Sequence, residues 1–141
     1  MANTASFNEE TNDGATARGT ALKTIGLCVA GWLVGYLISF VSFFLFFLLG
    51  RFSPEQPAST VLLWVVAIYG VVFAVAGALV GASFSRKHAL GIGASIALTI
   101  GAMALWSWYQ SPNLAHWTQL IAIFLMAPAA QFGALFRRLD Y

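Results

Sequence analysis

The feature that most constrains this chain is the spacing of its charged residues. Seven Lys or Arg and five Asp or Glu leave charge-free runs at residues 24–50, 56–85 and 88–136. A helix of about 20 apolar residues crosses a hydrocarbon core of about 30 Å. Each of the first two runs is long enough for one crossing, and the third is long enough for two.

Composition excludes the other broad classes of protein. The chain is 60% hydrophobic and 9% charged, whereas an ordinary soluble domain is roughly 25% charged. So few charges cannot coat a soluble globule, and a disordered chain is poor in apolar residues and rich in charge. The sequence therefore predicts an integral membrane protein.

A polar, proline-containing segment at residues 109–113 interrupts the third run and is typical of a turn. Membrane strands would alternate apolar and polar residues, and residues 61–68 do not alternate. Lipid cannot hydrogen-bond the backbone, so the apolar runs should be helical. We predict an all-α integral membrane protein, a four-helix transmembrane bundle over residues 24–138. Its helices are expected near residues 24–49, 59–84, 88–109 and 115–137.

The polypeptide outside this bundle is short. Residues 1–23 are polar and show no apolar periodicity, so they are expected to form a disordered cytoplasmic tail. They are also too polar, and the first apolar run is too long, for a cleaved signal peptide. Residues 139–141 form the C-terminus.

Positive charge predicts the orientation of the bundle. Four crossings place both termini and the middle loop on one side, with Arg18, Lys23 and the four residues named below, while Arg51 lies on the other side. Lys and Arg gather on the cytoplasmic side of membrane proteins, so both termini are predicted to be cytoplasmic, in the cell inner membrane. We interpret the basic helix ends as headgroup anchors, because no basic stripe suited to nucleic acid is present. These anchors are Arg86, Lys87, Arg137 and Arg138.

Small residues recur on one face of each predicted helix. Close backbone contact through small residues drives helix association in lipid, where burying leucine does not. The predicted helix-packing residues are Gly31, Gly35, Gly77, Gly81, Gly93, Gly101 and Gly133. We favour packing within one chain over a dimer contact. The opposite, aromatic face of the first helix is predicted to face lipid, and it carries Trp32, Tyr36, Phe40, Phe43 and Phe47.

The second and fourth helices end in matching patterns. Ala78-x-x-Gly81-Ala82-x-Phe84-x-Arg86 matches Ala130-x-x-Gly133-Ala134-x-Phe136-x-Arg138. Two repeated helical hairpins would produce this match. The cytoplasmic end of a membrane helix commonly carries small residues, then an aromatic residue and then a basic one, without any duplication. We favour that simpler explanation.

Residues that carry chemistry are scarce. Apart from Arg137 at the end of the fourth, the predicted spans contain no Asp, Glu, Lys or Arg, whereas proton-coupled carriers and voltage sensors use an ionisable group within the membrane. Cys28 is the single cysteine, which excludes a disulfide within the chain, and we interpret it as a structural thiol. His88 and His116 fall on opposite sides of the membrane and cannot share a metal ion. No catalytic, cofactor-binding or metal-binding residue is predicted.

Pro128 and Gln131 are the remaining polar or hinge candidates. Pro128 is expected to kink the fourth helix and free a carbonyl near Gln131. One interpretation makes the two residues a hinge or a polar point on a substrate path. The other, which we favour, has Gln131 hydrogen-bonding a neighbouring helix.

The sequence thus favours a non-enzymatic protein with a structural or accessory role in a membrane complex. The alternative is a small dimeric permease or channel for an ion or small solute, which would need a polar line through the bundle. The residues available for that line are Ser39, Ser42, Thr99 and Gln131. The expected partners are membrane lipids together with either a second copy or a larger complex, without nucleic acid.

Overall fold

A computed structural model of the chain describes residues 4–53 and 57–139, with side chains from Arg18 onward. Every regular element in this part of the chain is helical. The elements are α1 (Thr4–Gly50), α2 (Thr60–Ser83), the 3₁₀ turn η1 (Arg86–His88), α3 (Ala89–Gln110), α4 (Trp117–Ile121), the π-helical turn η2 (Ala122–Met126) and α5 (Ala127–Leu139). Because α4, η2 and α5 follow one another without a break, they form one continuous span.

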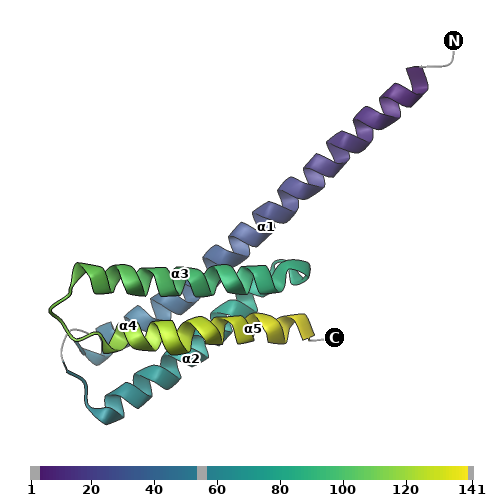
Figure 1. Cartoon of the computed structure of the whole chain (residues 1–141). Coiled ribbons are helices and arrows are strands. Elements are labelled where there is room, and N and C mark those ends of the chain that lie inside the picture. Colours follow the sequence, from purple (N-terminus) through teal and green to yellow (C-terminus); the bar gives the residue numbers. More distant parts are fainter. Residues whose placement is uncertain (1–3, 54–56, 140–141) are drawn as a thin grey trace.

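Four spans in the described chain are long and apolar enough to cross a membrane. They cover Arg18–Gly50, Thr60–Ser83, Arg86–Gln110 and Trp117–Leu139. Figure 1 shows them packed as a bundle, with the C-terminal end of α1, the N-terminal end of α2 and the 111–116 connection at one end. The predicted all-α, four-span fold is confirmed, and the last three spans begin and end within a few residues of the predicted limits.

The start of the first helix differs from the prediction. Residues 4–23 continue α1 as helix, although the sequence analysis expects a disordered tail there. At about 1.5 Å per residue, the 47 residues of α1 extend for roughly 70 Å. A helix satisfies its own backbone hydrogen bonds, and no proline interrupts this one. Figure 1 shows its N-terminal part projecting well beyond the other helices.

α1 and α2 cross through glycine. Gly31 lies against the Gly81 carbonyl, and a Cβ added to Gly35 would lie 2.7 Å from the Gly77 carbonyl oxygen. One turn further along, Ser39 is fully buried. Its hydroxyl donates to the Gly35 carbonyl oxygen at 3.0 Å and lies 3.3 Å from the Phe73 carbonyl oxygen of α2. The two backbones approach closely because these positions carry almost no side chain.

The other predicted packing glycines have different surroundings. A Cβ on Gly133 would lie 2.5 Å from the Val75 carbonyl oxygen of α2, and Gly93 packs on Ala134 of α5. Gly101 does not take part in packing, because a Cβ there would meet nothing within 4 Å. At about 100° per residue, Gly101 lies about 80° around α3 from Gly93, so it has turned away from the helix interface.

The two matching glycines of the possible repeat do not have equivalent neighbours. Gly81 contacts α1, the partner in its own hairpin, whereas Gly133 contacts α2 of the other hairpin. Ala134, the neighbour of Gly133, makes the contact with α3 instead. The duplication therefore stays a prediction, and this packing does not follow it.

The aromatic face of α1 is not simply lipid-facing, so that prediction is wrong for much of its length. Phe47 is 9% exposed and belongs to the core, and Trp32, Tyr36 and Phe43 pack against the same core. Phe40, at 49% exposed, is the member of the set that fits the prediction. The reason is that α1 has two packing faces, since its glycines contact α2 while its aromatic side chains face α3 and α4.

Candidate binding cleft between α1 and α3

The fourth span differs from the prediction in where Pro128 frees a carbonyl, and the hinge or polar role of Pro128 and Gln131 stays a prediction. The distortion lies before Pro128, in the π-helical turn η2, where the Ala127 amide donates to the Ala122 carbonyl. Proline removes the amide that would bond four residues back, at Phe124, so the carbonyl it frees is on the far side of Pro128 from Gln131. A π turn is a known way to absorb such a mismatch. Gln131 instead faces α3 near Gly93.

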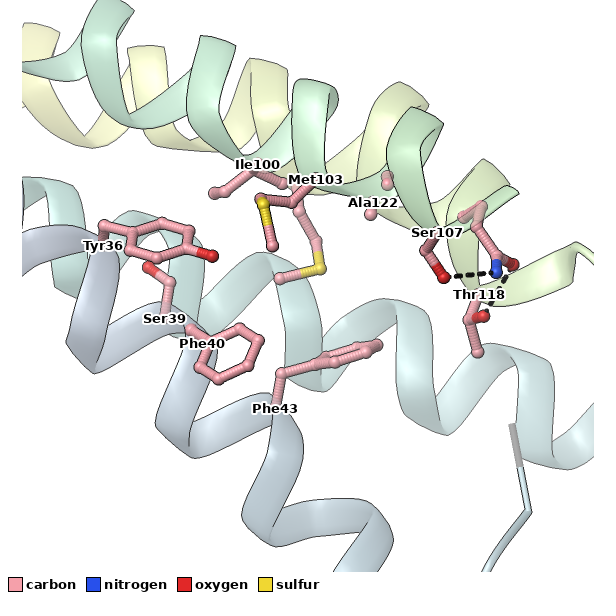
Figure 2. A pocket seen from close by; sticks show the side chains of 12 residues that line it. Tyr36, Ser39, Phe40, Phe43, Ile100, Met103, Ser107, Thr118 and Ala122 are labelled. Atoms are coloured by element: carbon pink, nitrogen blue, oxygen red, sulfur yellow. Dashed lines mark hydrogen bonds between the residues drawn. The ribbon is translucent and has the colours of Figure 1, made fainter. Parts of the chain in front are cut away.

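One opening in the described bundle lies between α1 on one side and α3 with the α4–η2 segment on the other. A cavity of about 230 Å³ occupies the half of the bundle that is nearer the C-terminal end of α1 and the 111–116 connection, and we call it the outer cavity. Aromatic and apolar side chains make up most of its wall. Figure 2 shows Tyr36, Ser39, Phe40 and Phe43 of α1 on one side, facing Ile100 and Met103 of α3.

A short polar chain lies at one end of the outer cavity. The Thr118 hydroxyl donates to Gln119 Oε1 at 2.8 Å, and Gln119 Nε2 donates to Ser107 Oγ at 3.2 Å. Figure 2 shows Ser107 and Thr118 close together at the α3–α4 end of the cavity, with these hydrogen bonds as dashed lines. The donors and acceptors face a mainly apolar space, as in sites that hold an apolar ligand and orient it by a few polar contacts.

A second cavity, of about 320 Å³, lies between α1 and α3 in the other half of the bundle. We call it the inner cavity. Cys28 and Trp32 line it from α1, and Gly91 and Ser95 line it from α3, with His88 at its end. His88 Nδ1 is hydrogen-bonded to Ser85 Oγ at 3.1 Å, and Cys28 is half-buried.

Trp32 and Thr99 join α1 and α3 between the two cavities. The Trp32 Nε1–H donates to Thr99 Oγ1 at 2.9 Å, and the Thr99 hydroxyl in turn donates to the Ser95 carbonyl at 2.7 Å. Ser95 likewise donates to the Gly91 carbonyl at 3.0 Å. Back-bonding of this kind satisfies serine and threonine within a helix, so α3 places hydroxyl groups among the apolar side chains of the cleft without any buried charge.

The polar residues that the sequence offers for a line through the bundle do not all lie together in the structure. Thr99 lies in the cleft, and Ser39 reaches the outer cavity from the α1–α2 crossing. Gln131 lies against Gly93 instead. Sequence reasoning missed Ser107, Thr118 and Gln119, although a repeated spacing of four residues connects Ser107 with Thr99. Gly91, Ser95, Thr99, Met103 and Ser107 of α3 follow one another at this spacing. Each step reaches a neighbouring part of the helix surface, so the series winds by about 160° around α3 from the inner to the outer cavity.

The basic anchors gather at one end of the molecule. Arg86 and Lys87 form η1, between α2 and α3, and Arg137 and Arg138 lie in the last turn of α5. We call this the basic end, and the other the Arg51 end. In the described chain, no group of three or more His, Cys, Asp or Glu side chains is placed to hold a metal ion.

Models of known protein families, curated proteins and solved structures were each compared with this chain, and none of them matches it.

Proposed function

We propose that this protein is a non-enzymatic accessory component of a membrane assembly, and that α1 carries its contact with the partner. The observation that supports this is the length of α1. A single crossing needs about 30 Å of helix, whereas α1 is roughly 70 Å long. Its N-terminal part therefore extends beyond the basic end (Figure 1), and we call this part the arm. A helix that is not covered by its own bundle offers a surface to another protein.

The side chains of the bundle support a binding role over catalysis. The titratable groups of the cleft are Tyr36, Cys28 and His88, and His88 already bonds Ser85. An activated nucleophile needs a base within hydrogen-bond reach and a third group to orient that base. No such set is assembled by the described residues.

Gly19 provides a matched pair of variants for the test. A Cβ at this position would meet nothing within 4 Å, so Gly19→Ala should leave the arm helical and the bundle unchanged. Gly19→Pro should break the arm, because proline inside a helix costs about 3 kcal/mol. The position lies outside the packed bundle, so both variants should still fold.

The experiment is purification in a mild detergent, with stoichiometry measured by mass spectrometry. The proposal expects a stoichiometric partner that co-purifies with the native chain and with Gly19→Ala but is lost with Gly19→Pro. A lone homodimer in all three samples, or a partner indifferent to Gly19→Pro, would remove the proposed role of the arm.

A second candidate is a small permease or channel formed by two copies. The observation that favours it is the pair of cavities on either side of the Trp32–Thr99 hydrogen bond. Such a partition would restrict passage, and Trp32→Phe would loosen it. Solute flux into liposomes tests this idea, and no flux of any tested ion or amine by either form would count against it.

The proposed location is the cell inner membrane with both termini in the cytoplasm, supported by the basic end and the positive-inside rule. Reporter fusions at the two termini test the orientation. Reporters that lie on different sides of the membrane would contradict it.

A further inference from the structure

The outer cavity continues into a larger groove that runs toward the Arg51 end. The groove encloses about 730 Å³ and shares Phe40, Phe43, Ser107 and Thr118 with the outer cavity. The two openings are therefore one channel along α1. Aromatic rings make its wall, since Tyr36 stacks on Phe40 at 5.8 Å and Phe40 on Phe44 at 6.4 Å between ring centroids.

The channel opens toward the surrounding bilayer. Phe40 and Phe44, which line it, are 49% and 56% exposed. An apolar channel that runs along a transmembrane helix and opens sideways is accessible to a hydrocarbon chain within the bilayer. A water-soluble ligand would gain little from such walls.

Arg51 lies at the mouth of the channel. It is the sole formally charged side chain that the structure describes at its end of the bundle, since the described Lys and other Arg residues lie toward the basic end or on the arm. Arginine binds phosphate with a planar fork of N–H donors. A cation at this depth also matches the headgroup layer, where it is attracted to anionic lipid.

The backbone holds Arg51 in an uncommon conformation. Its φ is 52°, the left-handed region that glycine usually occupies after a helix. The Phe52 amide donates to the Phe47 carbonyl oxygen at 3.2 Å, which is the bond that closes a Schellman turn. Gly50 is the preceding residue, yet Arg51 and not the glycine adopts the left-handed conformation. Uncommon backbone conformations are enriched at ligand sites, and here the residues of the turn, Arg51, Phe52 and Ser53, line the groove.

We propose that this channel is a binding site for one anionic phospholipid, with an acyl chain lying along Tyr36, Phe40 and Phe44 and the phosphate at Arg51. Ser107 and Thr118, which line the shared part of the channel, supply hydroxyls at the depth of the lipid ester groups. Charge complementarity selects an anionic lipid over other occupants of an apolar groove. The site is independent of the proposed accessory role.

Native mass spectrometry of the detergent-purified full chain tests the proposal. The probes are dioleoyl phosphatidylglycerol and dioleoyl phosphatidylcholine, which have the same chains and differ in charge. We expect one phosphatidylglycerol per chain, retained at least tenfold better than phosphatidylcholine. Arg51→Asn should abolish the preference, because asparagine tolerates the left-handed region but carries no charge. Arg51→Lys should retain most of the preference.

Two further variants test the acyl chain. Ser107→Phe places a ring in the shared part of the channel and should reduce retention of both lipids. Leu105→Phe is the matched control, because Leu105 is also exposed on α3 but does not line the channel, and it should leave retention unchanged. Circular dichroism and elution volume verify that each variant folds.

Several outcomes would overturn the site. Equal retention of the two lipids, unaffected by Arg51→Asn, would mean annular lipid only. Displacement of phosphatidylglycerol by inorganic phosphate or glycerol phosphate would mean a headgroup site without an acyl chain. Retention unaffected by Ser107→Phe would place the lipid elsewhere on the bundle.

Discussion

The two faces of α1 carry side chains of different size, and they pack against their neighbouring helices to different degrees. On one face, Gly31, Gly35 and Ser39 bring the backbone of α1 into contact with that of α2. On the other, Trp32, Tyr36 and Phe40 hold α3 at a distance and leave two cavities. In a membrane, where the solvent is as apolar as the side chains, small residues close an interface and large rings leave openings that lipid or another helix can fill.

The largest effect is expected where the glycine face is filled. A Cβ on Gly35 would lie 2.7 Å from the Gly77 carbonyl oxygen and 2.6 Å from Ile96 Cδ1. Gly35→Val should therefore force the helices apart and lower the free energy of unfolding by about 2–3 kcal/mol. Unfolding by SDS titration from mild detergent micelles measures this loss. Gly101→Ala is the control, expected to change stability by less than about 0.5 kcal/mol, because Gly101 faces open space. Equal losses for both would contradict the contrast.

A smaller effect is expected for the buried hydroxyl at the same crossing. Ser39→Ala removes the hydrogen bond to Gly35 and the approach to Phe73, and it should cost about 0.6–2 kcal/mol. The same SDS titration measures it. Ser83→Ala is a suitable reference, because the exposed Ser83 hydroxyl bonds only within its own helix, to the Leu79 carbonyl. A Ser39 variant no less stable than the Ser83 variant would show that the crossing depends on shape alone.

The bond that divides the cleft should contribute less. Trp32→Phe and Thr99→Val each remove the link between α1 and α3, and a hydrogen bond between membrane helices is worth about 0.6 kcal/mol on average. A double-mutant cycle on the unfolding free energy should give a coupling of this size. A coupling indistinguishable from zero would mean that the two side chains are neighbours without an energetic bond.

The smallest effect concerns the reactivity of Cys28. This half-buried thiol lines the inner cavity, so a small, membrane-permeant thiol reagent should modify it slowly in the folded protein. Ser95→Trp, on the opposite wall, should slow the labelling severalfold. Labelling that is as fast as in SDS-unfolded protein would contradict the enclosed position of Cys28.

Much of the fold follows from sequence because lipid imposes simple rules. Charge-free runs indicate where the chain crosses, and the glycines at 31, 35, 77 and 81 mark a contact that the structure contains. The prediction for the aromatic face of α1 is wrong because a ring next to lipid and a ring next to an open cleft have the same hydropathy. Only the placement of α3 distinguishes them.

The candidate site is less visible in the sequence. Ser107, Thr118 and Gln119 come from two helices and meet through the 111–116 connection, which no helical period encodes. The left-handed conformation of Arg51 depends on the turn that follows Phe47. A glycine would normally mark the left-handed position in the sequence. Here the glycine is Gly50, one residue before Arg51, so the sequence does not indicate which residue adopts this conformation.

The central claim is that α1 is closed against α2 and open toward α3. Photo-crosslinking in lipid nanodiscs tests it with a benzophenone analogue of phenylalanine, placed at Phe40 in one sample and at Phe46 in the other. Phe40 lines the cleft, whereas Phe46 packs on Tyr69 of α2 at 4.8 Å between ring centroids. The account predicts capture of phospholipid at position 40 and of α2 at position 46. Capture of α3 in place of lipid at position 40, or the same products at both positions, would contradict it.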